Sequence, residues 1–312
     1  MKLPERAARP TMYFIGVTTS QSSIMKVFPL WAEALGIDAV IKGIDIELDA
    51  DPRVYREVVE FIKDDEWSMG ALVTTHKINL YQAARDLFDE LDPYAEMFGE
   101  LSCISKRGGR LAGHAKDPIT SGLALEAFVP EDHWRRHGGE AFIMGAGGAA
   151  IAMSAHLLHE RNKDNVPSRL VVSDLSEARL AEFGRIMKMI NPLVPLELRA
   201  TPEPWMNDAL LAGMKRHSLI VNATGLGKDR PGSPLTDACE FPEGGLVWEI
   251  NYRGDLLFMR QALRQKDAKK LRVEDGWIYF LHGWTQVIAE VFHLDLTPER
   301  FAECARIADR FR

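Results

Sequence analysis

The sequence predicts an α/β protein of two domains, the second of them a doubly wound parallel sheet. Three observations lead to this fold class. At 312 residues the chain exceeds the length at which one hydrophobic core stops growing. Strand-like and helix-like segments alternate through the first third, and the alternation restarts after residue 140. A glycine-rich turn over residues 145–149 follows the first strand of the restarted series.

The first domain is expected to be a layered β/α domain covering residues 1–117. Apolar runs predict its strands, and segments with helical spacing predict the helices between them. Strands are expected at 11–17, 39–47 and 70–74, and helices at 22–35, 52–64 and after Lys77. Two short strands at 101–105 and 110–114 flank a Gly-Gly turn and predict a hairpin.

The second domain is expected to cover residues 118–274, and a linker helix after Pro118 leads into it. Its strands are expected at 141–144, 170–173, 196–199, 218–222, 245–250 and near 270–273. Two closing helices, 276–292 and 298–311, follow the last strand. We expect residues 275–312 to return to the first domain and complete it.

Composition excludes several classes of function. The formal net charge of −7 is spread along the chain with no basic stripe, so nucleic acid is not expected as a partner. No apolar run approaches the roughly 20 residues that cross a bilayer, and the N-terminus lacks the apolar core of a signal peptide. We therefore expect a cytoplasmic monomer or homodimer. The three cysteines are too scattered for a metal cluster, so no metal is expected.

The glycine turn predicts a dinucleotide site. Gly145 permits a tight turn after the strand, Gly147 lets the backbone approach phosphates, and Ala150 keeps the following helix close to the strand. The helix that begins near Gly147 presents free N–H groups and its positive end to a pyrophosphate. Ala146, Gly148 and Ala149 complete the turn, which indicates a nicotinamide cofactor.

Asp174 ends the next strand and favours NAD. A carboxylate there accepts hydrogen bonds from the adenosine ribose and repels the extra phosphate of NADP. Arg179 lies close enough in sequence to leave NADP possible. The alternative is that Asp174 only caps the helix that starts at Ser176.

Two polar segments of the first domain suggest acid/base chemistry. Lys77 stands where an apolar strand meets a helix, and Asp117 follows the hairpin just before the linker helix. Hydride transfer at a carbinol carbon needs a partner that moves the hydroxyl proton, and a lysine beside an aspartate can do this. Each alone is more often a surface charge.

Taken in order, these segments resemble the shikimate dehydrogenase family over nearly the whole chain. The serine-x-serine turn of that family, which binds the substrate carboxylate, is similar to the turn holding Ser20 and Ser22. Its Asn-Val-Thr-x-Pro-x-Lys signature resembles residues 72–77 with one residue dropped, and its Asn-Thr-Asp motif resembles residues 115–117. The resemblance implies that Lys77 and Asp117 are catalytic. Implied substrate-binding residues are Ser20, Ser22, Thr74, Ser102, Tyr252 and Gln286, and implied cofactor-binding residues are Gly145, Ala146, Gly147, Gly148, Ala149, Asp174, Asn222, Ala223, Thr224 and Gly276.

The departures from the family pattern concern the residues that read the substrate. Ser102 replaces an asparagine that binds a substrate hydroxyl, and Ala115 replaces the asparagine before the aspartate. Lys116 replaces a threonine; it is either solvated or a second cation for an acidic substrate. The glycine-to-glutamine interval before Gln286 is three residues longer than usual. The asparagine-arginine-threonine that reads the NADP phosphate becomes residues 173–175, with Asp174 at its centre.

The resemblance implies an NAD-preferring oxidoreductase that interconverts a ring hydroxyl and a ketone on shikimate, quinate or a related cyclic hydroxy-acid. One alternative is the same chemistry on a different polyol or an amino-substituted acid. Another, of a different class, is a nucleotide-sensing binding protein without turnover. For Tyr252, a packing role and a substrate-binding role are equally open. His282 and Trp284 are expected to pack in the core or the cleft wall. His76 is expected to point away from Lys77.

Overall fold

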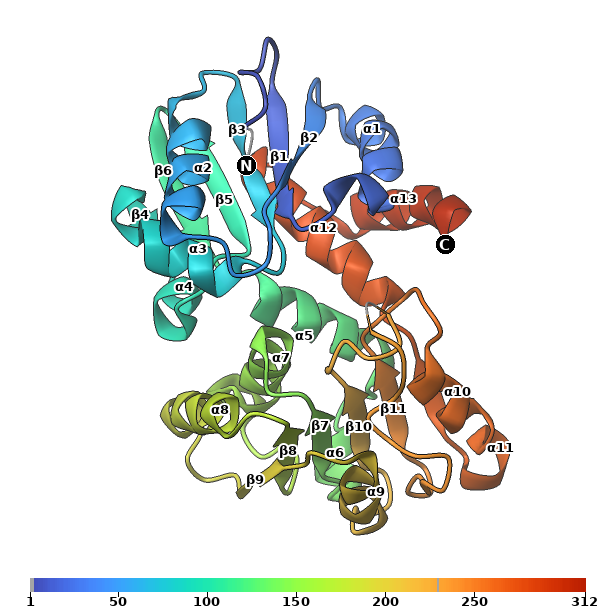
Figure 1. Ribbon diagram of the computed structural model, residues 1–312. Coiled ribbons are helices and arrows are strands. Elements are labelled where there is room, and N and C mark those ends of the chain that lie inside the picture. Colours follow the sequence, from blue (N-terminus) through green and yellow to red (C-terminus); the bar gives the residue numbers. More distant parts are fainter. Residues whose placement is uncertain (1–2, 229) are drawn as a thin grey trace. The chain divides into compact units, whose positions relative to one another are not determined.

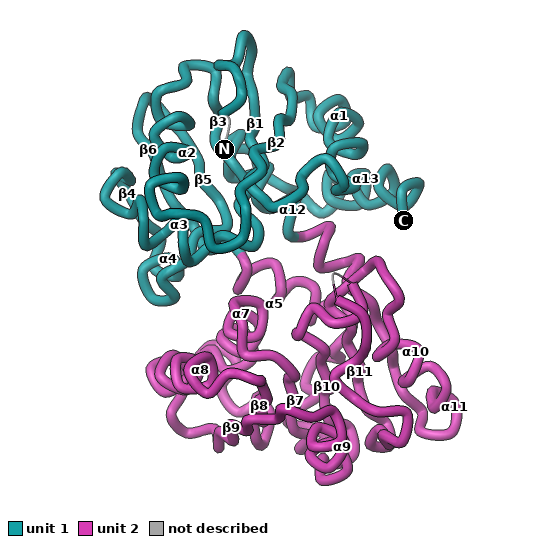
Figure 2. The backbone as a smooth tube through the Cα atoms, viewed as in Figure 1, with its two compact units in different colours: residues 1–116, 283–312 teal, residues 117–282 magenta. Residues whose placement is uncertain are grey.

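A computed structural model describes residues 3–228 and 230–312. The chain forms two compact units (Figure 2): unit 1 is Met1–Lys116 with Gly283–Arg312, and unit 2 is Asp117–His282. The sequence-based division assigned Asp117 and residues 275–282 to the first domain. In the structure both fall in unit 2: Asp117 begins a helix that packs along the helix after the glycine turn, and residues 277–282 form the first part of the helix Trp277–Val291.

Unit 1 is built on a six-stranded sheet in the order β2-β1-β3-β5-β6-β4 (Figure 1). Its strands are β1 (Thr11–Gly16), β2 (Val40–Asp45), β3 (Ser68–Val73), β4 (Glu90–Leu91), β5 (Cys103–Arg107) and β6 (Arg110–His114). Its helices are η1 (Thr19–Gln21), α1 (Ile24–Leu35), α2 (Pro52–Asp64), α3 (Lys77–Ala84), η2 (Arg85–Leu87), α4 (Pro93–Phe98), α13 (Pro298–Ala308) and η4 (Asp309–Phe311). Helix α12 (Trp277–Val291) begins in unit 2 and ends in unit 1.

Parallel pairing sets the site-bearing edge of the unit 1 sheet. Strand β1 pairs in parallel with both β2 and β3, so the carboxyl ends of all three lie together. The predicted hairpin is confirmed as the antiparallel pair β5 and β6. The return of the closing helices is also confirmed: α13 packs against α1, and Trp31 Nε1 donates to the Cys304 carbonyl at 2.7 Å.

Unit 2 is a fully parallel sheet in the order β12-β11-β10-β7-β8-β9, which confirms the predicted doubly wound architecture. Its strands are β7 (Ala141–Met144), β8 (Leu170–Asp174), β9 (Leu196–Ala200), β10 (Leu219–Asn222), β11 (Leu246–Glu249) and β12 (Arg272–Glu274). Its helices are α5 (Asp117–Phe128), α6 (His133–His137), α7 (Gly148–Leu158), η3 (Glu160–Asn162), α8 (Glu177–Ile190), α9 (Pro204–Ala212), α10 (Leu257–Leu263) and α11 (Lys266–Lys269).

The strand order of unit 2 reverses between β7 and β10. From β7 the chain adds β8 and β9 on one side and then crosses back to add β10, β11 and β12 on the other. Ligands of such sheets bind outside the carboxyl ends of the strands at this reversal. The fold therefore directs a ligand to the ends of β7 and β10, which are held on a core containing Phe142, Ile220 and Phe258.

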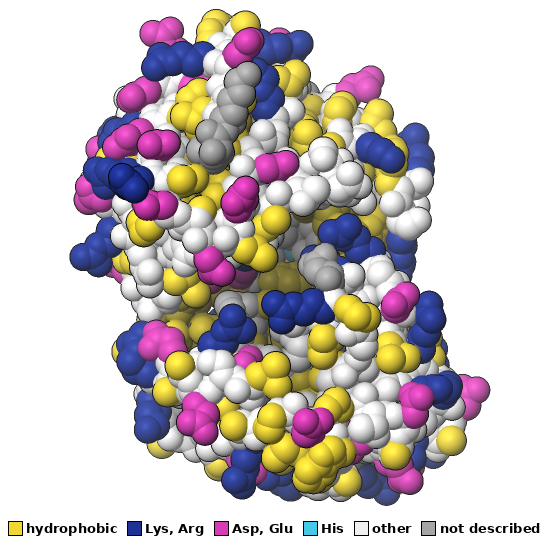
Figure 3. Space-filling view, viewed as in Figure 1, with side chains coloured by type: hydrophobic (Ala, Val, Ile, Leu, Met, Phe, Trp, Pro, Cys, Tyr) yellow, Lys and Arg dark blue, Asp and Glu magenta, His cyan; other side chains and the backbone are white. Residues whose placement is uncertain are grey.

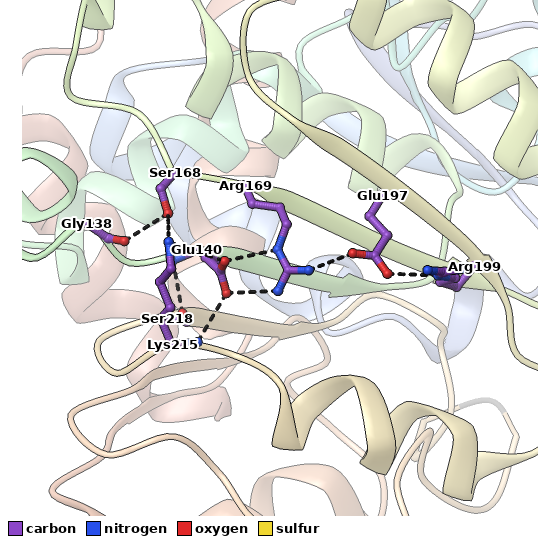
Figure 4. A network of polar contacts seen from close by, with 8 residues as sticks. All are labelled: Gly138, Glu140, Ser168, Arg169, Glu197, Arg199, Lys215 and Ser218. Carbon is purple, nitrogen blue, oxygen red and sulfur yellow. Dashed lines mark hydrogen bonds and ion pairs between the residues drawn. The ribbon is translucent and has the colours of Figure 1, made fainter.

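An ion-pair network ties the opposite, amino-terminal edge of the same sheet together (Figure 4). Arg169 clamps both carboxylate oxygens of Glu140 at 3.0 and 3.1 Å and reaches Glu197 at 2.6 Å. Glu197 also accepts from Arg199, and Lys215 donates its backbone N–H to Glu140. The Glu140 side chain is only 5% exposed, so its charge depends on these partners.

On the face shown in Figure 3, acidic and basic side chains are interspersed rather than gathered by sign. Among the described residues, no helix combines the length and the hydropathy that a membrane crossing requires.

Breaking the Glu140 network should destabilise unit 2. We expect Glu140→Gln to lower the free energy of unfolding by about 2–4 kcal/mol, because Arg169 loses its buried counter-charge. Glu182→Gln, which removes the partner of Arg185 in an exposed pair, is the control and should cost no more than about 0.5 kcal/mol. Urea denaturation measures both. Equal losses in the two variants would show that the Glu140 network contributes no more than a surface pair.

Acid should destabilise unit 2 well above the range in which ordinary carboxyls titrate. Burial lowers the pKa of His156 and of His282 from 6.5 to about 4. Between pH 6.5 and about pH 4, these two histidines are therefore protonated in the unfolded chain but neutral in the folded chain, so acid in this range favours unfolding. Burial raises the pKa of Glu249 to about 7, which offsets part of this loss between pH 7 and 4.5.

We expect each of these histidines to remove about 2 kcal/mol of stability between pH 7 and pH 4.5. Urea midpoints across this pH range measure the loss. His156→Gln keeps a polar side chain but cannot titrate, so its stability should fall less steeply with acid than that of the wild type. Identical slopes for the two proteins would contradict the assignment to His156.

Candidate active site

The loop after β1 carries Ser20 and Ser22 and is anchored to β2. Thr19 is buried, and its backbone N–H and its hydroxyl donate to Asp45 Oδ1 at 2.8 and 2.6 Å. A Cβ built at Gly43 on β2 would lie 2.0 Å from Thr19 Oγ1, so only glycine lets the loop come this close. Ser20 is exposed and Ser22 is half-buried. The two serines thus stand on a fixed loop at the carboxyl end of β1.

The loop between β3 and α3 carries Thr74 and Lys77. The Thr74 N–H extends the pairing with β1 by donating to the Ile15 carbonyl at 3.0 Å. Thr75 then adopts a φ of +60°, and the His76 N–H donates back to the Thr74 carbonyl, which closes a strained γ-turn. This turn shortens the loop where the family signature has one more residue and a proline. Lys77 is consequently the first residue of α3.

His76 is turned into the core of unit 1. It is 2% exposed, with Nε2 at 3.0 Å from the Ile46 carbonyl and Nδ1 at 3.4 Å from the Tyr55 hydroxyl. Burial lowers the pKa of His76, so the ring is neutral near pH 7. A neutral ring bonded to Ile46 and Tyr55 gives no support to a direct role at Lys77.

Backbone contacts bring the loops of unit 1 together at one edge. The Leu101 N–H donates to the Lys77 carbonyl at 3.1 Å, and the Val73 N–H donates to the Ser102 carbonyl at 2.9 Å. A Cβ at Gly16 would lie 3.1 Å from the Thr74 methyl group, and at a similar distance from that of Thr19. Thr74, Lys77, Ser102 and the serine loop therefore occupy adjoining positions at the carboxyl ends of β1 and β3.

The Ser102 side chain contacts the backbone of its own unit. Ser102 is 3% exposed, and its Oγ accepts the Lys116 N–H at 2.7 Å and lies 3.4 Å from the His114 carbonyl. Its hydroxyl is therefore engaged with the backbone that leads to Asp117. Ala115 is fully buried and presents no polar atom of its side chain.

Lys116 is neither a solvated charge nor an uncompensated second cation. Its side chain is 14% exposed, and its Nζ donates to Glu290 of α12. His114 Nε2 lies 3.5 Å from the same carboxylate. A hollow of about 330 Å³ in unit 1 is lined by Lys116, Glu290 and Gln286. Gln286 therefore shares this hollow with the Lys116–Glu290 ion pair.

Asp117 begins α5 and belongs to unit 2. It is 8% exposed, and its carbonyl accepts the hydroxyls of Thr120 and Ser121 at 3.3 and 2.7 Å. Helix α5 packs along α7, where a Cβ at Gly122 would lie 2.1 Å from His156 Nδ1. The position of Asp117 is thus set by the helix that follows the glycine turn, whereas Lys77 lies in unit 1.

The glycine turn of unit 2 has the geometry that its sequence predicts. Gly145 has a φ of +102°, and a Cβ there would lie 2.5 Å from the Ala223 carbonyl oxygen. A Cβ at Gly147 would meet no atom within 4 Å, so this part of the turn faces open space. Gly147 caps α7, whose first N–H groups have no acceptor within the helix. The turn therefore suits a pyrophosphate.

Asp174 holds the glycine turn as well as facing the cavity. Its Oδ2 accepts the Ala146 N–H and its Oδ1 accepts the Ser176 N–H, each at 2.8 Å. Asp174 therefore also contributes to the start of α8, as the alternative interpretation expected, because it accepts the N–H of Ser176, the N-cap residue of that helix. A carboxylate oxygen has a further lone pair, so these bonds leave capacity for ribose hydroxyls.

A cavity of about 270 Å³ lies at the predicted dinucleotide site. Its lining includes Gly147, Asp174, Arg179, Ala223, Thr224 and Arg230. Asn222 sits beneath it, and its Oδ1 accepts the N–H and the hydroxyl of Thr224 at 3.1 and 2.7 Å. The cavity unites the glycine turn, the acidic strand end and the loop after β10, and the chemistry of its lining fits a nicotinamide dinucleotide.

Two site residues escaped the sequence reasoning. Arg230 lines the cavity from a loop without regular structure, and no pattern marks it. Glu249 ends the apolar strand β11 with 0% exposure and contacts Asn222. A charged residue closing an apolar strand was the available signal for Glu249.

The remaining predicted residues lie in packed surroundings. The ring of Tyr252 contacts Phe280 and Trp277, at centroid distances of 4.6 and 5.6 Å. Gly276 lies so close to β11 that a Cβ would meet the Ile250 carbonyl oxygen at 2.0 Å. Trp284 is 6% exposed and packs edge-on against Phe14, as expected for a core residue. His282 is half-buried.

Within residues 3–228 and 230–312, no group of three or more acidic, histidine or cysteine side chains is placed to hold a metal ion.

Comparison with known proteins yields full-length relatives, although no family model matches the chain. The chain is 26% identical over 296 residues to a shikimate dehydrogenase (NADP(+)) of Methylocella silvestris, covering 94% of this chain and 95% of the relative. It is 29% identical over 261 residues to the shikimate dehydrogenase (NADP(+)) of Thermus thermophilus, covering 83% of each.

Solved structures share the fold at lower identity. Shikimate 5-dehydrogenase of Listeria monocytogenes, in complex with shikimate and NAD, aligns with a TM-score of 0.73 at 17% identity over all of this chain and 99% of that one. Quinate dehydrogenase of Corynebacterium glutamicum, in complex with NAD, aligns with a TM-score of 0.72 at 17% identity over 97% and 99%. These likenesses establish the two-unit fold.

Proposed function

We propose that this chain, which is similar to shikimate dehydrogenases over nearly its whole length, is a divergent member of that family and an NAD-preferring oxidoreductase. In this proposal it interconverts a ring hydroxyl and a ketone on shikimate, quinate or a related cyclic hydroxy-acid. The observation that carries the proposal is the cavity at the ends of β7, β8 and β10, where the glycine turn, Asp174 and Thr224 meet. A dehydrogenase of this kind needs such a dinucleotide site.

The residues of unit 1 supply the substrate half of the proposal. Ser20 and Ser22 on their anchored loop, with Thr74 beside them, offer hydroxyl donors for a carboxylate. A bound nicotinamide dinucleotide would exchange the hydride with the carbinol carbon. Lys77 and Asp117 would exchange the proton with its oxygen, which is the step that needs positioned acid/base groups.

A second substrate class is favoured by the state of Ser102. Since its oxygen accepts the Lys116 N–H and its hydrogen is directed to the His114 carbonyl, Ser102 adds no donor that matches the asparagine of the family. A buried hydroxyl that loses its partner discriminates strongly against the original ligand. The alternative is therefore the same chemistry on a different polyol or an amino-substituted acid. Lys116 and Gln286, which line the hollow of unit 1, would then be candidates for contacting that substrate.

The proposed cofactor preference can be measured directly. We expect NAD to bind at least about tenfold more tightly than NADP, a difference of about 1.4 kcal/mol, because the Asp174 carboxylate repels a ribose phosphate. Arg179 and Arg230 line the same cavity and oppose this effect. Calorimetric titration with both cofactors shows whether the repulsion by Asp174 or the attraction by the two arginines dominates. Asp174→Asn should narrow the preference, and it should also weaken the binding of both cofactors because its NH2 group would face the Ala146 N–H in the glycine turn; equal affinities in the wild type would defeat the argument from Asp174.

The proposed chemistry requires turnover that depends on Lys77. Steady-state assays with shikimate and quinate, each with NAD and NADP, should find activity with at least one pair. Lys77→Ala should lower kcat by about 10² to 10⁴ with cofactor affinity unchanged, because the proton loses its carrier. Lys26→Ala, on the exposed face of α1, is the control and should behave as wild type. Absence of turnover with every pair would favour the nucleotide-sensing alternative, and a fully active Lys77→Ala would assign the proton elsewhere.

A further inference from the structure

Glu249 is a charged side chain buried at the carboxyl end of the unit 2 sheet. It is the last residue of β11 and is 0% exposed. Removing a carboxylate from water is costly unless donors surround it. Burial raises the pKa of Glu249 to about 7, and the nearby Asp275 carboxylate adds to the shift. A group kept at such a cost needs a reason in its contacts.

Three N–H donors hold the Glu249 carboxylate. Asn222 Nδ2 donates to Oε2 at 2.7 Å, while the N–H and the Nδ2 of Asn251 donate to Oε1 at 2.9 and 2.7 Å. All three groups give a hydrogen and none of these contacts offers an acceptor. Above its pKa of about 7, Glu249 is an acceptor-only carboxylate, which matches this arrangement, whereas an amide of the same shape does not.

The same two asparagines hold the loop that lines the cofactor cavity. The Nδ2 atoms of Asn222 and Asn251 both donate to the Leu226 carbonyl at 3.2 Å. Asn222 Oδ1 accepts from Thr224, which fixes which end of the amide faces Glu249. Ala223, Thr224 and Leu226 all line the cavity. Glu249 thus orients both amides that grip this loop without lining the cavity itself.

We propose that Glu249 is a positioning residue, which through Asn222 and Asn251 fixes the loop of residues 223–227 in the shape that binds the dinucleotide. The inference rests on the proposed function only for the identity of the ligand. In physical terms, the Glu249 carboxylate accepts and the two asparagine amides donate. This pattern of donors and acceptors sets the orientation of the Asn222 amide. If that orientation fails, Thr224 and Leu226 lose their contacts together.

Glu249→Gln tests this polarity with almost no change of volume. The new amide would present a donor either to Asn222 Nδ2 or to the two donors of Asn251, so one contact becomes repulsive. We expect the Kd for NAD, measured by calorimetry, to rise about tenfold, which corresponds to the loss of one buried hydrogen bond. In the absence of cofactor, amide hydrogen exchange in residues 223–227 should accelerate by a similar factor.

The exchanged pair Asn222→Asp with Glu249→Gln restores the polarity in the opposite sense. The amide introduced at position 249 can then donate to the carboxylate introduced at position 222, while its oxygen still accepts from both donors of Asn251. The new carboxylate keeps an acceptor for Thr224, but its other oxygen faces the Leu226 carbonyl oxygen, so that one contact becomes repulsive while Asn251 still donates to Leu226. We expect this double variant to recover part of the lost affinity and loop protection, a rescue that general destabilisation cannot produce.

Glu140→Gln is the matched control, because it neutralises a buried carboxylate at the far edge of the same sheet. It should lower stability yet leave the Kd for NAD within about twofold of wild type, as expected for a distant site. Asn251→Ala, which removes one grip on Leu226 and leaves Glu249 intact, gives a milder test should Glu249→Gln fail to fold. It should also raise the Kd and accelerate exchange in residues 223–227.

The outcomes separate the inference from the proposed function. If the wild type binds neither NAD nor NADP, the proposed cofactor is wrong, and hydrogen exchange in residues 223–227 still decides whether Glu249 holds the loop. Wild-type affinity and unchanged loop exchange in Glu249→Gln would overturn the inference. So would an equal loss of affinity in Glu140→Gln, because the effect would then follow stability rather than the loop.

Discussion

The cofactor half of this protein depends on one steric constraint, the approach of the Gly145 turn to the backbone that follows β10. No side chain larger than a hydrogen fits at Gly145, because the Ala223 carbonyl occupies the place of a Cβ. The approach lets the Gly145 N–H reach the Ser173 carbonyl and the Ala223 N–H reach the Met144 carbonyl, both at 2.7 Å. Three strand ends are thereby joined before any side chain takes part.

The polar groups of the cavity follow from this junction. Asp174 can bond the Ala146 N–H only because the turn is tight, and Asn222 can serve the loop after β10 only because that loop starts beside the turn. Unit 1 uses the same device, with Gly43 admitting Thr19 to the surface of β2 so that Asp45 can hold the serine loop. In both units, a glycine leaves room for a close approach of the backbone, and a carboxylate then accepts hydrogen bonds that hold the loop. The loop is therefore already ordered before a ligand binds, so binding does not bear the entropic cost of ordering it.

Sequence patterns were sufficient wherever structure depends on neighbours along the chain. The helix α2 begins and ends where its spacing predicts, because Asp51 caps it and Pro52 occupies its first turn. The glycine turn was equally predictable. Contacts between distant segments were not: Lys116 meets Glu290 across 174 residues, and no periodicity encodes that pair. The expected domain boundary differs by one residue at Asp117, which begins α5 in unit 2; α5 packs on α7, and no local pattern marks that packing.

Ser102 is a polar residue whose hydroxyl is engaged within the protein itself. A serine hydroxyl has one hydrogen to donate, and here its oxygen accepts the Lys116 N–H while the His114 carbonyl lies within reach of that hydrogen. Under the proposed function, recognition in unit 1 rests on groups that stay accessible, namely the serine loop, Thr74 and the hollow of Lys116, Glu290 and Gln286. An ion pair in that hollow favours a ligand that can replace one of its partners, since splitting a half-buried pair without compensation is costly.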